Sequence, residues 1–253
     1  MRAAYFRNFE AVKYLLDQGA DPNVPSIPPD CEQATLPIHY AALFGKMNIV
    51  ELLLERGAVV DGADKHGRNA IHYAADDGYG AIVKLIVKHG VAVDFPDDEG
   101  ATALPYGAVR GGPEIVKLLL SMGAAVDAAD VNGKTALHKS CRAGSEIAGL
   151  LIENGANINA ADFVGRTTLH HAAEIGDPKL VSLLLNKGAR PKARDIQGRL
   201  SGDIAKNDVT RDLLTAAFVR YEATEIFAHI ESAQGTAGDS TNGNGNKRKS
   251  GRL

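Results

Sequence analysis

The sequence repeats itself with a period of 33 residues. Ten-residue segments align without gaps, among them NAIHYAADDG at 69–78 and TTLHHAAEIG at 167–176. The anchor position of this segment recurs at intervals of 33, 33, 33, 32 and 33 residues, at His39, His72, Pro105, His138, His170 and Asp203. A second marker keeps the same period and the same one-residue deletion, at Gly57, Gly90, Gly123, Gly155 and Gly188. Two markers that share one period predict a stack of supersecondary units rather than a closed globule.

Each unit carries signals for a turn followed by two helices. A turn such as 162–165 ends on glycine, which adopts a positive φ without strain. Thr135 follows its turn directly, at a position where threonine caps a helix start. The first helix carries pairs of small residues, as at 74–75, and the second is rich in leucine and isoleucine, as in IVELLLERG at 49–57. Neither helix can bury its apolar stripe alone, so each unit needs neighbours.

This pattern resembles that of the ankyrin repeat family, over about residues 1–215. The family pattern D-x-x-G-x-T-P-L-H-x-A-A followed by V-V-x-L-L-L-x-x-G-A is met most fully at 64–90 and 162–189. The resemblance implies an all-α solenoid in which each unit has a β-hairpin loop and two antiparallel helices. It also implies that the stack binds other proteins, and that the repeated histidine hydrogen-bonds backbone groups of adjoining hairpins.

Two positions stand out beside the repeated histidine. Pro105 replaces it in the fourth unit, which removes a side-chain hydrogen-bond donor there. His171 follows His170 directly and points elsewhere on a helix, so we expect it on the surface.

We expect five parts along the chain. Residues 1–23 hold only the second half of a unit, residues 24–33 are a proline-rich insertion, and residues 34–215 form the array of about six repeats. Residues 216–233 have apolar residues at helical spacing and are predicted to cap the stack, with a partner-binding helix as the alternative. Residues 234–253 are rich in glycine, serine, threonine and asparagine, which predicts a disordered basic tail.

Charge and composition exclude several classes of protein. The formal net charge is −3; removing the +3 of the last twenty residues leaves −6 on residues 1–233, which argues against a surface that grips nucleic acid. Two cysteines are too few for a disulfide framework. No apolar run reaches the roughly 18 residues of a membrane span. We therefore expect a monomer in the cytoplasm or the nucleus. The basic run 246–250 is either a solvated terminus or a nuclear-import signal.

Candidate catalytic groups do not combine into a site. The repeated histidines lie on different units about 10 Å apart, so we do not expect them to share a metal ion. Residues 132–135 resemble the end of a phosphate-binding loop, but its first glycine is missing. Cys141 occupies a slot for small packed residues rather than the basic, exposed setting of a nucleophile. We expect no enzyme activity and no cofactor. A hydrolase or nucleotide-binding enzyme is the alternative that titration with ATP and divalent metals would test.

The expected function is protein binding, as a scaffold, adaptor or inhibitor, through the concave side of the stack. Phe163 and Val164 form an apolar pair at a turn, where they either anchor a partner or pack against a neighbouring hairpin. Acids gather in the third and fourth units and bases in the C-terminal half, which would steer a partner of matching polarity. The candidate partner-binding residues are Lys65, His66, Arg68, Asp76, Asp77, Asp98, Glu99, Arg110, Lys134, Arg142, Phe163, Val164, Arg166, Glu174, Ile175 and Arg199.

An alternative is that the chain is the regulatory ankyrin fragment of a larger signalling or transcription-related protein. In that case the catalytic domain would lie outside this chain. Met1 falls in the middle of a unit, which favours this alternative.

Overall fold

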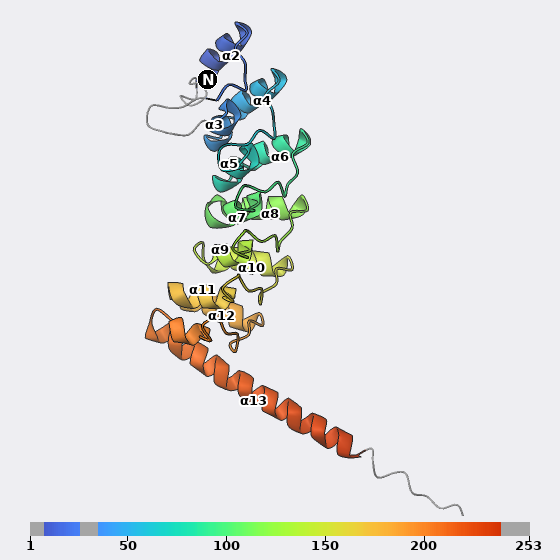
Figure 1. Ribbon diagram of the computed structural model, residues 1–253, viewed down its shortest axis with the longest axis vertical. Helices are drawn as coiled ribbons and strands as arrows, with labels where there is room; N and C mark the ends of the chain where they lie inside the picture. The colour runs from blue at the N-terminus through green and yellow to red at the C-terminus, as the bar shows by residue number, and fades with distance from the viewer. Residues whose placement is uncertain (1–7, 26–34, 239–253) are drawn as a thin grey trace, which may run out of the picture.

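The computed structural model describes residues 8–25 and 35–238. Short helices stack in pairs along the long axis of the molecule, and one long helix leaves the C-terminal end of the stack (Figure 1). In chain order the elements are α2 (Phe9–Asp17), α3 (Pro37–Leu43), α4 (Met47–Glu55), α5 (Ala70–Asp76), α6 (Gly80–Lys88), α7 (Ala103–Tyr106), the π-helical turn η1 (Gly107–Gly111), α8 (Pro113–Ser121), α9 (Ala136–Ser140), α10 (Ser145–Glu153), α11 (Thr168–Ile175), α12 (Pro178–Asn186), the 3₁₀ turn η2 (Ser201–Ile204) and α13 (Asp208–Gly238).

The helices form two layers. The inner layer contains the first helix of each unit, α3, α5, α7, α9 and α11, and each contacts the next along the chain. The outer layer contains α4, α6, α8, α10 and α12. Ala74 and Ala75 are fully buried between inner helices, and Leu53 and Ile86 are fully buried beneath the outer layer. Small side chains let the inner helices approach closely, while the larger aliphatic residues fill the space between the layers.

The turns between units contain little β-structure. Within the described residues, no strand is formed, and the β-pairing is limited to isolated bridges such as Ala161 with Thr167 and Arg194 with Leu200. The expected β-hairpin loops are therefore tight turns, each closed by one bridge or by none. The helical solenoid predicted from the repeat is confirmed.

The fourth unit departs from the others at Pro105. Helix α7 ends one residue later, at Tyr106, and the chain continues as the π-helical turn η1. In the third, fifth and sixth units, Nδ1 of the anchor histidine accepts a hydrogen bond from the backbone N–H of the residue that caps the inner helix, whereas the side chain of Pro105 has no polar atom. The hydroxyl of Thr102 is consequently buried without a hydrogen-bond partner. The lost donor predicted from the sequence thus leaves an unsatisfied polar group.

Gly111 ends this π-helical turn at a close approach between units. A Cβ atom at this position would collide with the backbone carbonyl oxygen of Ala75 in the preceding inner helix. Only glycine therefore fits here without a shift of one unit against the other.

The C-terminal helix is longer than predicted. It begins at Asp208 instead of 216, and it includes residues 234–238, which were expected to be disordered. Leu214 is buried against the last unit, whereas the distal part of α13 extends away from the stack (Figure 1). Most of the proline-rich insertion and the basic run 246–250 lie outside the described residues.

Candidate functional site

Five turns of the form Asp-x-x-Gly recur along the stack, and we call them the turn ladder. In the turn 162–165, Oδ1 of Asp162 accepts hydrogen bonds from the backbone N–H groups of Val164 (3.1 Å) and Arg166 (2.9 Å). These two hydrogen bonds close the turn. They also hold the carboxylate in the interior, where the side chain of Asp162 is only 1% exposed. The turn ladder comprises residues 64–67, 97–100, 130–133, 162–165 and 195–198.

Backbone hydrogen bonds join successive turns of the ladder. The N–H of Val131 donates to the carbonyl oxygen of Glu99 (2.7 Å), and the N–H of Phe163 donates to that of Asn132 (2.9 Å). The same bond links the first and second turns, and the fourth and fifth, at 2.9 and 3.0 Å. Side chains at the same position of successive turns are therefore aligned in one row along the stack.

The last three turns carry exposed apolar side chains, which we call the apolar ridge. Its members are Val131, Phe163, Val164 and Ile196; Phe163 and Ile196 are 74% and 71% exposed. Phe163 also packs on the preceding turn, because a Cβ atom on Gly133 would lie 2.7 Å from Cδ1 of its ring. The packing interpretation of Phe163 thus holds in part, and its role as a partner anchor stays a prediction. Val131 and Ile196 were not among the candidate residues, although their alignment with Phe163 in the Asp-x-x-Gly pattern is visible in the sequence.

The repeated histidine ties each inner helix to the next turn. Nδ1 of His138 accepts a hydrogen bond from the backbone N–H of Thr135 (3.1 Å), and its Nε2 lies 3.0 Å from the carbonyl oxygen of Ala160. In His39, His72 and His170, Nε2 lies 2.7, 3.2 and 3.2 Å from a carbonyl oxygen in the turn region of the following unit. Each ring joins its own unit to the following one, which confirms the structural role expected of these histidines.

A second periodic contact was missed by the sequence analysis. The residue after the anchor position donates to Oδ2 of the aspartate that opens its own turn, nine residues earlier. The donors are Tyr73 (2.6 Å), Tyr106 (2.6 Å), Lys139 (2.8 Å) and His171 (3.0 Å). The available signal was a hydrogen-bond donor at one fixed position in four successive units.

This contact changes the ionisation of the groups involved. Burial opposes the charge on Asp64, but hydrogen bonds from Tyr73 and from two backbone N–H groups, together with the guanidinium of Arg68, lower its pKa to about 2. His171 was expected on the surface; instead it is half-buried against Asp162, and its ring lies 5.5 Å from that of His138. Burial lowers the pKa of His171, while Asp162 opposes that shift.

Arginines predicted as partner contacts are engaged within the stack. Arg68 and Arg199 pair with the aspartates of their own turns at 2.9 and 2.7 Å. Arg166 lies 3.1 Å from Glu174 and 3.7 Å from Asp195, and therefore links two units. These side chains keep 21–36% of their surface exposed, so they face solvent beside the acids they neutralise.

The predicted acidic region in the third and fourth units is partly neutralised. Arg110 reaches back to Asp76 (3.1 Å) and Asp77 (3.5 Å) on the preceding inner helix. Burial raises the pKa of Asp76, and the charge of Arg110 opposes that shift. The other predicted residues of these units, Lys65, His66, Asp98 and Glu99, lie exposed on the first two turns of the ladder.

Four predicted residues come together around one cavity. It is lined by residues of the fourth to sixth units and has a volume of about 320 Å³. Lys134, Arg142, Glu174 and Ile175 line it, and we call it the inner-helix cavity. The remaining lining residues are Val109, His138, Lys139, Cys141 and His171.

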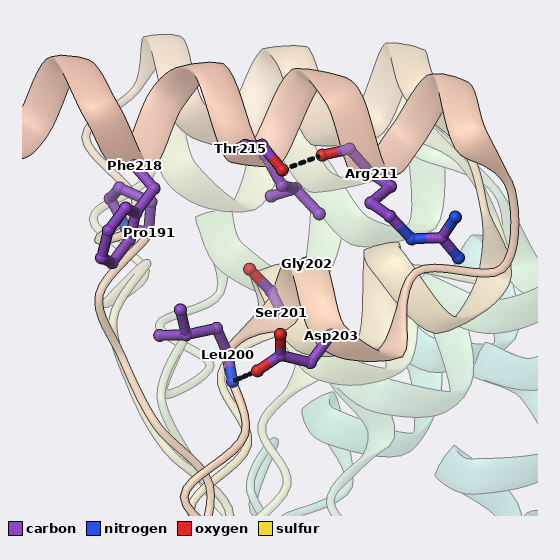
Figure 2. A pocket seen from close by; sticks show the side chains of 9 residues that line it. Pro191, Leu200, Ser201, Gly202, Asp203, Arg211, Thr215 and Phe218 are labelled. Carbon is purple, nitrogen blue, oxygen red and sulfur yellow. Dashed lines mark hydrogen bonds between the residues drawn. The ribbon is translucent and has the colours of Figure 1, made fainter.

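A second cavity of about 390 Å³ lies between the last unit and α13 (Figure 2). Its polar groups bind one another: Asp203 accepts from the N–H of Leu200 (2.8 Å), and the hydroxyl of Thr215 donates to the carbonyl oxygen of Arg211 (2.9 Å). Phe218 and Pro191 line the end of the cavity that lies away from Arg211 (Figure 2). The cavity lies where α13 leaves the stack, and each of these two hydrogen bonds stays within one element, η2 with its cap or α13.

The side chains described so far give little support to a catalytic role. Burial raises the pKa of the Cys141 thiol to about 12, so the thiolate required of a nucleophile does not form near neutral pH. Within residues 8–25 and 35–238, no three histidine, cysteine, aspartate or glutamate residues are grouped so that they could hold a metal ion. In the same residues, none of the helices combines the length and apolar character that a bilayer crossing requires.

Known structures share this architecture. The ankyrin repeat domain of human ASB11 superposes with a TM-score of 0.72 at 26% identity, over 85% of this chain and 96% of that one. The ankyrin repeat domain of Bcl-3, described as a unique member of the IkappaB protein family, superposes with a TM-score of 0.67 at 24% identity, over 84% of this chain and 96% of that one. The latter likeness concerns the fold alone.

Sequence comparison leads to the same family. The E3 ubiquitin-protein ligase hecd-1 of Caenorhabditis elegans is 39% identical over 69 residues, which are 27% of this chain but 2% of the ligase. The family model for ankyrin repeats, which spans three copies, matches residues 1–97, 38–130 and 106–195. Ankyrin repeats are protein-interaction modules rather than catalytic ones. The chain belongs to the ankyrin repeat family.

Proposed function

We propose that this chain binds a partner protein on the concave side of its stack and acts as a scaffold, adaptor or inhibitor without catalysing a reaction. The binding surface combines the turn ladder with the exposed ends of the inner helices. The apolar ridge carries this proposal. Large apolar side chains at the tips of a soluble protein's turns are unfavourable in water unless another surface covers them.

The rigidity of the ladder supports the same proposal. Backbone hydrogen bonds between turns fix the backbone positions that carry the ridge side chains before any partner arrives. Less conformational entropy is then lost on association, which raises affinity for a given contact area. Phe163 and Ile196 are the expected anchors, because exposed aromatic and aliphatic groups on a rigid frame contribute most when a partner covers them.

The test compares binding by three forms of the chain. The intact chain captures a partner from its native cell, the partner is identified by mass spectrometry, and its affinity is then measured directly. Replacing Phe163 and Ile196 together by serine should weaken this affinity at least about tenfold. The melting temperature should stay unchanged, since both side chains are mostly exposed. The control is Val59→Ser, which removes an exposed apolar side chain from the loop after α4. Equal affinity for all three forms would remove the ridge from the binding surface.

A second candidate is a regulatory ankyrin segment of a larger protein whose catalytic domain lies elsewhere. The segment matched by this chain makes up 2% of the hecd-1 ligase. That likeness favours the second candidate. An antibody raised against the turn ladder would test it on native cell extract. A band far above 26.7 kDa supports the larger protein, and a single band at that mass argues against it.

A further inference from the structure

We propose that the inner-helix cavity receives an acidic side chain of the partner, with its carboxylate held between Lys134 and Arg142 and its aliphatic neighbours against Val109 and Ile175. This inference rests on the proposed protein-binding function and specifies the chemistry of the partner. It follows from the charges, the walls and the size of the cavity.

The first argument is that two cations at the cavity lack a counter-ion. Lys139 also lines the cavity, but its ammonium lies 2.8 Å from the carboxylate of Asp130. Among the described residues, the side chains of Lys134 and Arg142 form no hydrogen bond or ion pair, although both line the same 320 Å³ cavity. A carboxylate placed between them would gain two charge-assisted hydrogen bonds.

The second argument is the sign of the charge that this surface presents. The side chain of Asp130 is 3% exposed, whereas that of its partner Lys139 is 25% exposed. Asp195 is 1% exposed, whereas Arg199 and Arg166, which lie beside it, are 36% and 21% exposed. These two turn acids are thus hidden behind the bases that neutralise them. Glu174, which also lines the cavity, is 56% exposed, and its carboxylate lies 3.1 Å from the guanidinium of Arg166. An approaching partner meets the bases first, and an acidic one is attracted.

The third argument is that the cavity walls suit a peptide better than a nucleic acid. Val109 is half-buried and Ile175 is 38% exposed, so apolar surface flanks the two cations. The residues that line the cavity include no phenylalanine, tyrosine or tryptophan on which a base could stack. A volume of about 320 Å³ accommodates one or two side chains rather than a polymer backbone. A glutamate or aspartate beside leucine, isoleucine or valine fits this combination.

The experiment selects binding peptides from random sequences, so the partner itself is not required. A phage-displayed library of random peptides about twelve residues long is panned against the full chain, and the strongest peptide is synthesised with a fluorescein label. We expect glutamate or aspartate beside aliphatic residues. In fluorescence anisotropy, Lys134→Gln and Arg142→Gln should each raise the Kd about tenfold, and so should a glutamine in place of the peptide's acid. Lys88→Gln, an exposed cation in the last turn of the outer helix α6, is the matched control and should leave the Kd unchanged.

The outcomes separate this inference from the proposed function. Neutral or basic peptides that lose affinity when Phe163 and Ile196 are replaced would overturn the acidic partner and leave the binding surface standing. Acidic peptides whose Kd is insensitive to Lys134 and Arg142 would overturn this cavity as their site. Failure to select any peptide, or tighter binding of a twenty-nucleotide oligo(dT) probe that the two variants abolish, would overturn the inference in favour of no ligand or a nucleic acid.

Discussion

Mild acid is expected to destabilise the stack steeply, because four of its buried side chains are neutral imidazoles. His39, His72, His138 and His170 are at most 4% exposed, and Nε2 of each lies within 3.2 Å of a backbone carbonyl oxygen. Burial is the largest influence and lowers the pKa of each below 6.5, and the hydrogen bond to the carbonyl opposes this only in part.

The sign and size of the effect follow from proton linkage. Because the pKa of each ring is lower in the folded chain, the unfolded chain binds more protons once the pH falls below 6.5. The stabilisation is therefore complete above pH 6.5 and is lost as the pH falls through the folded-state pKa values. One proton of difference changes the free energy of unfolding by about 1.4 kcal/mol per pH unit, so four rings set an upper slope of about 5 kcal/mol per pH unit. A domain of ordinary stability, about 5–15 kcal/mol, would show this loss within one or two pH units.

Urea unfolding followed by far-ultraviolet circular dichroism at pH 7.5, 6.5 and 5.5 measures this slope. The carboxylate of Asp64 stays ionised throughout this range, since its pKa is about 2. His138→Asn should reduce the slope by about 1.4 kcal/mol per pH unit. His66→Gln, at an exposed turn position, should leave the slope as it is. A free energy of unfolding that does not change between pH 7.5 and 5.5 would refute the reasoning, because the folded stack would then accept imidazolium as readily as the unfolded chain does.

Two further predictions test the contacts between and within units, again by urea unfolding. Tyr106→Phe removes the 2.6 Å hydrogen bond to the buried Asp97 and should lower the free energy of unfolding by about 1–3 kcal/mol; a loss under about 0.5 kcal/mol would contradict the importance of this contact. Gly111→Ala should cost about 1–3 kcal/mol, because the new methyl group collides with a carbonyl oxygen. Its control, Gly149→Ala in α10, meets only a side chain at 3.8 Å and should be neutral or stabilising by up to about 1 kcal/mol. Equal effects of the two glycine substitutions would argue against the close approach between units.

The parts of this structure that could be predicted from the sequence are those that repeat. A period of 33 residues reports a unit whose helices must be covered by neighbours, so the stacking of α3 to α12 follows from spacing alone. The roles of His138 and Thr135 follow for the same reason. Each stands at a fixed distance from a turn, and the short inner helix brings them within 3.1 Å of each other.

What could not be predicted depends on contacts outside the repeated pattern. His171 was placed on the surface because position on the helix was considered alone, whereas its environment is set by the carboxylate of Asp162 in the turn before it. The π-helical turn after Pro105 and the full length of α13 belong to no repeated pattern, so no second copy revealed either of them. The inner-helix cavity draws its lining from the fourth to sixth units, and the spacing of one unit does not describe a space shared by three.

The formal net charge of the sequence was a poor guide to the charge of the proposed binding surface. The formal net charge of −3 suggested a mildly acidic body, and the sum is correct. A partner, however, interacts with charges according to their exposure as well as their number. The turn aspartates accept two backbone hydrogen bonds with one oxygen, which holds them inside the ladder, and side chains such as Lys139 and Arg199 then cover the other oxygen. Asp64, Asp130 and Asp195 therefore each pair with a partly exposed base, whereas Tyr106 covers Asp97 and His171 covers Asp162. The turn geometry that joins the units thus also places basic side chains on the surface.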